Sequence, residues 1–213
     1  MPTLQITEIF YSLQGETRTS GFPTVFIRLT GCPLRCHYCD TEYAFTDGKT
    51  LELTEILATV KQYQAKYITV TGGEPLAQKE CLTLLSMLCD LDYDVSLETS
   101  GAISLDGVDS RVCTVMDIKT PASGEADKNL WSNLEQLKAK DQIKFVICDQ
   151  DDYHWMKTIA DIHDLYHRCE VLVSPSFGEI DHRQLAEWIL EDKLPFRYQL
   201  QLHKLLWDDE PGR

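Results

Sequence analysis

The chain has 213 residues, of which 34 are acidic and 20 basic, so its formal net charge is −14 at pH 7. A chain this acidic repels phosphate backbones, which argues against nucleic acid as its main partner. The length and the 43% of hydrophobic residues predict one globular domain over 1–213. No apolar run approaches the roughly 20 residues of a membrane span, and the first five residues show no signal segment. We therefore expect a cytoplasmic protein that does not bind membranes.

Seven short runs rich in Val, Ile and Thr predict β-strands. In chain order they are Thr24–Leu29, Tyr67–Thr71, Asp94–Thr99, Val112–Lys119, Gln142–Ile147, Glu170–Ser174 and Arg197–Leu202. Between most of them, apolar residues recur at helical spacing: Leu53, Ile56, Leu57, Val60; Leu82, Leu85, Leu88, Cys89; Tyr153, Met156, Ile159, Ile162, Leu165; and Leu185, Trp188, Ile189. This alternation predicts an α/β fold with a parallel sheet. A closed eight-fold barrel usually needs about 250 residues, so we expect an open, incomplete (β/α) barrel.

Polar motifs follow most of the predicted strands. At the ends of the first four strands and of the sixth lie 31–41, 72–75, 98–101, 117–121 and 174–178, and His203-Lys204 follows the seventh. The carboxyl ends of parallel strands share one rim, where ligands bind. Turns punctuated by Gly and Pro explain any one of these motifs, but not so many at one end. The sequence therefore predicts a ligand site at this rim.

Three of the eight cysteines, Cys32, Cys36 and Cys39, lie within eight residues at the spacing C-x3-C-x2-C. In a reducing compartment such a cluster indicates a metal site rather than a disulfide framework. The other five sit mostly among apolar neighbours and are expected to be small buried side chains; they are Cys81, Cys89, Cys113, Cys148 and Cys169.

The cysteine spacing alone does not decide which metal the loop binds. Structural zinc takes four ligands, and the obvious fourth, His37, directly follows Cys36, which makes joint ligation awkward. A 4Fe-4S cluster is usually held by four cysteines, so three would leave one iron open to a small molecule. The spacing favours an iron–sulfur site. Zinc, and a non-catalytic scaffold or electron carrier, remain alternatives.

The segment CPLRCHYC over 32–39 resembles the C-x3-C-x-aromatic-C signature of radical S-adenosylmethionine (SAM) enzymes, with Tyr38 at the aromatic position. The segment GGEP over 72–75 is similar to the motif whose backbone meets the SAM amino group in that superfamily. The resemblance implies a 4Fe-4S cluster whose open iron binds SAM. It also implies that reduction of the cluster cleaves SAM to a 5′-deoxyadenosyl radical. The cofactor then performs the radical chemistry, and the protein orients the reacting molecules.

Further segments resemble the 7-carboxy-7-deazaguanine synthases, carbon–nitrogen lyases of the queuosine pathway of tRNA modification. They are 8–16, 25–29, 39–41, 71–75, 98–101 and 202–204, and together they span nearly the whole chain. The family converts 6-carboxy-5,6,7,8-tetrahydropterin to 7-carboxy-7-deazaguanine with loss of ammonia. The resemblance implies hydrogen abstraction at the carboxylate-bearing carbon, radical ring contraction and return of the hydrogen. It also implies a flavodoxin-like reductant and a homodimer.

The same resemblance implies a role for each of three sets of residues. The cluster would be held by Cys32, Cys36 and Cys39, and Mg2+ by the hydroxyl of Thr41, a hard oxygen ligand. SAM would contact Tyr38, Cys39, Asp40, Gly73, Asp117, Ile118 and Lys119. The pterin would contact Leu13, Gln14, Gly15, Arg28 and Thr71. Arg28 can hold a carboxylate through a charged fork, and Gln14 offers both a donor and an acceptor to an aminopyrimidinone edge.

Each of these roles has a structural alternative. Arg28 could be an ion-pair partner, Gln14 and Thr71 could satisfy backbone groups, and Thr41 could cap the next segment. Many relatives have Ser-Pro-Lys where this chain has Asp-Ile-Lys over 117–119, so Lys119 alone transfers directly. Among enzymes, the alternative is a radical SAM activase that makes a glycyl radical on a partner protein. It would share the cysteine loop and GGEP but would need neither 13–16 nor Arg28.

Overall fold

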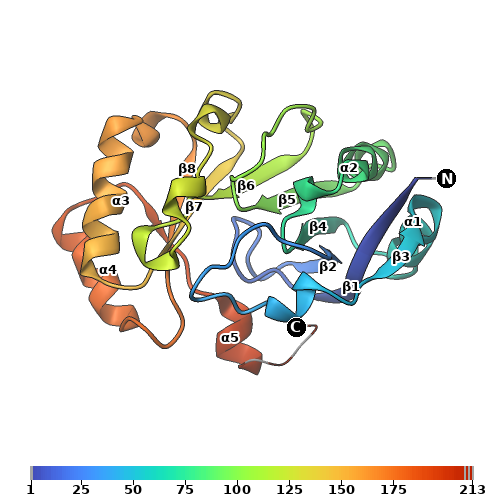
Figure 1. Cartoon of the computed structure of the whole chain (residues 1–213). Helices are drawn as coiled ribbons and strands as arrows, with labels where there is room; N and C mark the ends of the chain where they lie inside the picture. The colour runs from blue at the N-terminus through green and yellow to red at the C-terminus, as the bar shows by residue number, and fades with distance from the viewer. Residues whose placement is uncertain (1, 209, 211, 213) are drawn as a thin grey trace.

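A sheet of nine strands forms the frame of the molecule in the computed structural model, which describes residues 2–208, 210 and 212 (Figure 1). The strands are β1 (Thr3–Leu13), β2 (Pro23–Leu29), β3 (Lys49–Glu52), β4 (Tyr67–Gly72), β5 (Asp94–Thr99), β6 (Cys113–Asp117), β7 (Gln142–Ile147), β8 (Glu170–Pro175) and β9 (Arg197–Tyr198). Their order is β3-β1-β2-β4-β5-β6-β7-β8-β9. From β2 to β9 every pair is parallel, whereas β1 is antiparallel to both β2 and β3. The sheet curves without closing, which confirms the expected open barrel.

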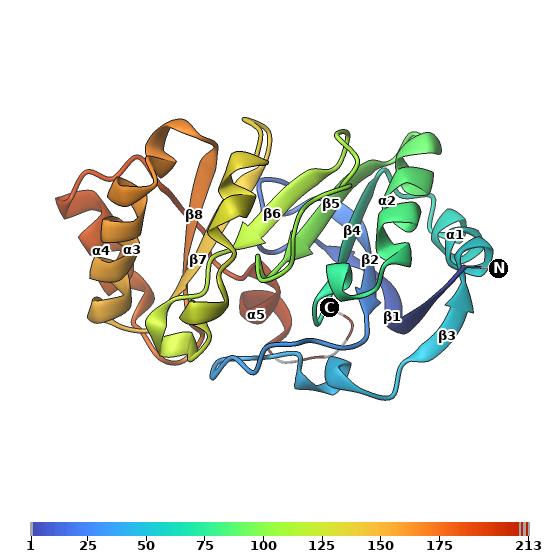
Figure 2. The same cartoon turned by 45° about the horizontal axis from the view of Figure 1, so that its top comes forward.

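Four helices cover the outer face of the sheet, and a fifth lies on its inner side (Figure 2). They are α1 (Leu53–Gln62), α2 (Glu80–Asp90), α3 (Gln150–Ile162), α4 (His182–Glu191) and, on the inner side, α5 (Leu202–Trp207). Short 3-10 turns occupy Glu42–Phe45 (η1), Pro75–Ala77, Pro121–Ser123, Ala126–Lys128, Trp131–Glu135 and Leu165–His167. Aspartates cap α3 and α4: Asp149 and Asp181 accept hydrogen bonds from the backbone N–H groups of Asp152 and Gln184. None of the helices in the described part of the chain combines the length and apolar character that a membrane crossing requires.

The two faces of the sheet differ in chemistry because side chains alternate along a strand. On β4, Ile68 and Val70 are fully buried in the apolar core beneath α1 and α2. Their neighbours Thr69 and Thr71 point to the inner face instead, where both donate or accept side-chain hydrogen bonds. A second apolar core lies between β7, β8 and the helices α3 and α4. The hydrophobic cores are therefore outside the barrel, and its interior is left to polar side chains.

The last predicted strand is wrong beyond Tyr198. Only Arg197–Tyr198 pairs with β8, and Leu202–Trp207 is helical. The reason lies in Gly15, whose carbonyl accepts hydrogen bonds from the Gln199 side chain (3.1 Å) and the Leu202 backbone (3.1 Å). These bonds direct the chain across the barrel opening instead of along the sheet edge.

Other boundaries also differ from the sequence prediction. The sequence did not predict β1 and β3. The strand predicted to end at Lys119, β6, ends at Asp117 instead, because the Lys119 backbone N–H donates to the Asn129 side chain at 2.9 Å. Ile162 is 67% exposed rather than packed. The buried face of α2 comprises Cys81, Leu84, Leu85 and Leu88. Of the scattered cysteines, Cys81, Cys113 and Cys148 are buried as expected, whereas Cys89 and Cys169 are half-buried.

Candidate active site

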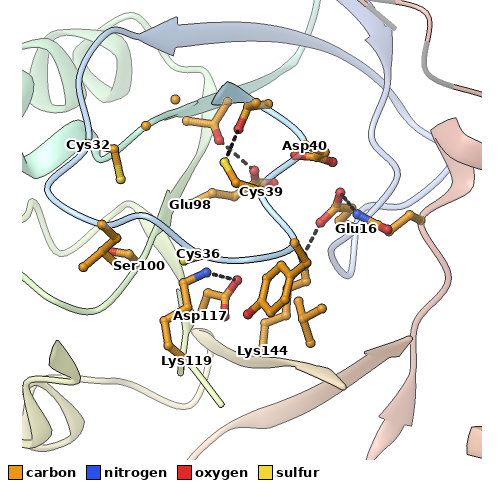
Figure 3. Close-up of a pocket in the computed structure, with 18 of the residues that line it drawn as sticks. Glu16, Cys32, Cys36, Cys39, Asp40, Glu98, Ser100, Asp117, Lys119 and Lys144 are labelled. Atoms are coloured by element: carbon orange, nitrogen blue, oxygen red, sulfur yellow. Dashed lines mark hydrogen bonds and ion pairs between the residues drawn. The ribbon is translucent and has the colours of Figure 1, made fainter. Parts of the chain in front are cut away.

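A cavity of about 430 Å³ opens at the carboxyl ends of the parallel strands. Its wall is built from the cysteine loop after β2, the glycine turn after β4, the ends of β5, β6 and β7, the loop after β8 and the start of α5 (Figure 3). These are the segments in which the sequence placed its polar motifs. The common rim that topology predicts is therefore the wall of one cavity.

The cysteine loop carries three free thiols, Cys32, Cys36 and Cys39, that all line the cavity. The guanidinium of Arg35 holds the loop in shape, since it donates to the carbonyls of Cys32 (2.8 Å) and Leu34 (2.6 Å). Burial raises the pKa of Cys36 to about 11. The thiol is therefore protonated at neutral pH until a metal centre displaces its proton.

The donor set of this loop fits a centre held by three thiolates with one open position. No fourth cysteine lines the cavity in the described residues. The imidazole Nε2 of His37 lies 3.3 Å from Glu179 and is largely exposed, so it pairs with that carboxylate. A structural zinc site, which needs a fourth protein ligand, is not assembled by these side chains.

The turn after β4 approaches the cysteine loop so closely that only glycine fits. A Cβ added to Gly73 would lie 2.2 Å from the Gly31 carbonyl oxygen and 2.8 Å from Cys32 Cβ. The preceding Gly72 has φ +151° and would bring its own Cβ within 2.3 Å of the Leu29 carbonyl oxygen. Bare backbone is thereby presented to the cavity beside the thiols.

The buried carboxylate of Glu74 holds this turn in place through hydrogen bonds. Its side chain is fully buried, and its carboxylate accepts hydrogen bonds from the Leu76 backbone (2.9 Å), the Thr99 hydroxyl (2.9 and 3.0 Å), and the backbone (2.7 Å) and hydroxyl of Ser100. All these donors are neutral, and together they occupy both oxygens. Glu74 therefore joins the turn after β4 to the turn after β5 and does not face the cavity.

Two half-buried carboxyl groups and a buried lysine, Glu16, Glu98 and Lys144, line another part of the cavity. Lys144 forms an ion pair with Glu16, which also accepts a hydrogen bond from Gln201 (3.0 Å) and lies 3.6 Å from His203. Burial alone would raise the pKa of Glu16, but Lys144 and His203 lower it to about 2. Glu98 pairs with no cation in the described residues, and burial together with the charge of Glu16 raises its pKa.

A second ion pair lies closer to the thiols. Lys119 Nζ is 2.9 Å from Asp117 Oδ2 (Figure 3) and 5.6 Å from the centre of the Tyr38 ring. Burial opposes the charge of Lys119, yet Asp117 outweighs it and raises the lysine pKa. The other Asp117 oxygen and the Tyr38 hydroxyl are buried with no hydrogen-bond partner among the described residues. Buried polar atoms normally have a hydrogen-bond partner, so these two atoms fit a site where a bound polar ligand supplies it.

Comparison with known proteins identifies the family. Residues 26–112 match the model of the radical SAM superfamily. The chain is 42% identical over 210 residues to the 7-carboxy-7-deazaguanine synthase of Chlorobaculum tepidum, with 97% of this chain and 96% of the relative covered. This chain belongs to the 7-carboxy-7-deazaguanine synthase family. The synthase of Koribacter versatilis is 40% identical, with 97% and 98% covered. The crystal structure of QueE from Escherichia coli has the same fold, with a TM-score of 0.78 at 21% identity over 93% and 94% of the two chains.

Most of the residues that the synthase resemblance singled out line the cavity. They are Arg28, Cys32, Cys36, Tyr38, Cys39, Asp40, Thr41, Thr71, Gly73, Asp117 and Lys119. The Thr41 hydroxyl lies 3.9 Å from Cys39 Sγ and makes no capping hydrogen bond to the 3-10 turn that follows it. The carboxylate of Asp40 is 3.7 Å from Lys204 Nζ.

Four of the expected residues do not line the cavity. Ile118 is buried in the outer apolar core, and Leu13 ends β1. The Gln14 side-chain amide donates to Thr69 (3.1 Å) and Glu98 (3.1 Å) and accepts from the Glu16 backbone N–H (2.8 Å), so both of its polar atoms are engaged within the protein. Gly15 packs on α5, where an added Cβ would lie 2.7 Å from His203 Nδ1. In this synthase Gln14 and Gly15 therefore support the cavity wall from behind.

Three charged residues of the cavity, Glu16, Glu98 and Lys144, had no role in the sequence prediction, although 98–101 was placed at the rim and 8–16 among the segments that resemble the family. Two of them carried a readable signal. Lys144 is a charge inside the apolar run Gln142–Ile147, and Glu98 alternates with the buried residues Val95 and Leu97. A charge at a strand position that must be buried needs a partner or a function. Glu16 lies outside any strand, and nothing in its spacing points to Lys144.

We expect Glu74→Ala to destabilise the fold by about 2–4 kcal/mol, because buried donors on Thr99, Ser100 and Leu76 would lose their acceptor. Glu74→Gln should cost less, since one oxygen remains. Urea unfolding of the metal-free protein measures both. The exposed residue Glu187 gives a matched control, and Glu187→Ala should change stability by less than about 0.5 kcal/mol. Equal effects at the two positions would contradict the anchoring role.

The Lys144–Glu16 pair predicts a pH-dependent stability. Because the pKa of Glu16 falls from 4.5 to about 2 on folding, its contribution is present above pH 4.5 and is lost as the pH falls toward 2. Lys144→Met should therefore destabilise by about 2–4 kcal/mol at pH 7, where it leaves the half-buried Glu16 carboxylate without its lysine and with His203 as its neighbouring basic group. The loss should be smaller at pH 4, where Glu16 can take up a proton. Urea titrations at both pH values test this, with the exposed-pair variant Lys128→Met as control; a loss that does not change with pH contradicts it.

Proposed function

We propose that this chain catalyses the ring contraction of 6-carboxy-5,6,7,8-tetrahydropterin to 7-carboxy-7-deazaguanine with loss of ammonia, as a carbon–nitrogen lyase. The observation that carries the proposal is that three unpaired thiols and the guanidinium of Arg28 line one cavity. A carboxylate held by Arg28 would place the adjoining ring carbon beside the cysteine loop. Such placement is worth several powers of ten in rate.

The thiols of Cys32, Cys36 and Cys39 would hold a 4Fe-4S cluster, and the cluster with SAM supplies the radical that starts the reaction. The chain positions the SAM molecule. The Gly73 N–H donates to the Leu29 carbonyl at 3.2 Å, so its carbonyl would be the group that accepts from SAM, with no side chain in the way. Asp117 and Lys119 present a buried acceptor and a cation on the cavity wall. Tyr38 contributes the aromatic surface between them.

The pterin would occupy the inner part of the cavity. Its N–H donors face the carboxyl groups of Glu16 and Glu98, while Arg28 takes its carboxylate. Glu16 is ionised and accepts hydrogen bonds. Thr71 donates to Glu98 at 3.0 Å and fixes the direction of that carboxyl group.

Thr41 would bind Mg2+ through its hydroxyl, with the remaining positions filled by substrate and water. The same proposal includes a flavodoxin-like electron donor, a homodimer, one domain over 1–213 and a cytoplasmic location. These four features rest on the resemblance and on the composition of the sequence.

Anaerobic reconstitution tests the proposal directly. We expect about four irons and four sulfides per chain in the wild type and none in Cys36→Ala, because three thiolates are the full set that the loop supplies. The reconstituted protein, given the carboxytetrahydropterin, SAM and a reductant, should release 7-carboxy-7-deazaguanine, detected by mass spectrometry. Stoichiometric zinc, or a glycyl radical formed on a partner protein without turnover of the pterin, would overturn the proposal.

Thr41 gives a separate test of the Mg2+ site. Thr41→Ala should weaken the Mg2+ dependence of turnover while the cluster content and the affinity for SAM stay unchanged. Thr41→Ser should keep more activity, because the ligating oxygen survives. If Ser and Ala lose equal activity and both lower the melting temperature, the residue is structural.

A further inference from the structure

Arg28 enters the cavity in a fixed orientation. Its Nε donates to Glu8 Oε1 at 2.7 Å, and its side chain is only 14% exposed. The Phe10 ring lies 5.6 Å and the Tyr43 ring 5.9 Å from its central carbon. No described residue accepts a hydrogen bond from the two Nη atoms. Glu8 thus holds the guanidinium at Nε, and the rings of Phe10 and Tyr43 lie near its planar faces. The two Nη atoms remain as a pair of hydrogen-bond donors.

A bulge in β1 brings Glu8 to this position. Ile6 is paired with Leu29, and Glu8 is paired with Arg28, so β1 carries one extra residue between the two pairs. In a regular ladder Glu8 would oppose Ile27, and its side chain would point to the outer apolar core. The extra residue turns Glu8 to the inner face, directly across from Arg28. The ion pair therefore depends on an irregularity in the sheet.

The same carboxylate oxygen has a second donor. The Tyr43 hydroxyl donates to Glu8 Oε1 at 2.9 Å. Tyr43 belongs to the turn η1, which begins directly after Thr41. Glu8 thus joins β1, β2 and the turn beside Thr41.

We propose that Glu8 and Tyr43 are positioning residues that make the cavity selective for pterins with a 6-carboxylate. Glu8 occupies the Nε edge of Arg28 and repels a second carboxylate from it. A substrate carboxylate is left with the Nη edge, the donor pair that faces the cavity. Tyr43 keeps the guanidinium in this plane and sets its distance from the Thr41 turn. The inference rests on the proposed function, because it assigns the carboxylate of that substrate to Arg28.

The test compares two fluorescent probes, 6-carboxypterin and unsubstituted pterin, which differ by the carboxylate alone. Their binding to anaerobically reconstituted protein with SAM is followed by fluorescence quenching, so no turnover is needed. The wild type should prefer 6-carboxypterin by about tenfold or more, the difference expected for one charge-assisted contact. In Glu8→Gln this preference should fall at least about fivefold, while the affinity for unsubstituted pterin changes less than about twofold.

Tyr43→Phe keeps the ring but loses the hydrogen bond, and should reduce the preference about two- to threefold. It also keeps the inference testable if Glu8→Gln does not fold. Glu42→Gln is the matched control, because it removes an exposed acidic charge from the same turn and should leave both affinities unchanged.

The outcomes separate this inference from the proposed function. If the variants of Glu8 and Tyr43 keep the wild-type preference, or weaken both probes equally, these residues are structural and the inference is wrong, while the proposed function stands. If the wild type binds neither probe, the proposed substrate is wrong, and the inference fails with it.

Discussion

Charges inside the barrel must be paired, because removing an ion from water costs several kcal/mol even after the protein relaxes. The interior follows this constraint with three ion pairs, Arg28–Glu8, Lys119–Asp117 and Lys144–Glu16. Two of the pairs join different segments of the chain. Arg28–Glu8 links the neighbouring strands β2 and β1, and Lys144–Glu16 links β7 to the loop after β1. Two interior carboxyl groups have no cation partner among the described residues: Glu74 is held by neutral donors, and burial and the charge of Glu16 raise the pKa of Glu98.

The polar interior is possible because the apolar cores lie elsewhere. The helices bury Ile68, Val70, Val95 and Leu97 on the outer face of β4 and β5. The inner face is then free to carry Thr69, Thr71 and Glu98 without loss of the main hydrophobic stabilisation. The separation lets this chain keep a cavity on the inner face of a sheet whose outer face is well packed.

The elements with strong periodicity could be predicted from the sequence. The parallel strands β4, β5, β7 and β8 have short β-branched runs, and the helices between them have clear apolar stripes. The cavity rim followed from topology, because parallel strands place their carboxyl ends together. β1 could not be predicted in the same way, since the bulge before Glu8 breaks its alternation.

The residues that the resemblance assigns to the substrate lie in or directly behind the wall of one cavity, but the sequence did not predict their contacts with other side chains. Gln14 has the donor and acceptor that a pterin edge needs, yet tertiary contacts with Thr69 and Glu98 occupy them. The strand predicted to end at Leu202 ends at Tyr198, because the carbonyl of Gly15 accepts hydrogen bonds from the residues that follow. Both outcomes depend on residues more than 50 positions distant, beyond the reach of local patterns.

That carbonyl, of Gly15, has a consequence for how the protein is made. Gly15 and Glu16 accept hydrogen bonds from Gln199, Gln201 and Leu202, which lie more than 180 positions later in the sequence. Contacts with such separation form late, because the loop between them must close first. During synthesis the wall beside Glu16 therefore stays open until residue 202 has left the ribosome. Chains stalled before that point would carry a complete cysteine loop but an unfinished cavity, so cluster loading during translation would meet a site still exposed to solvent.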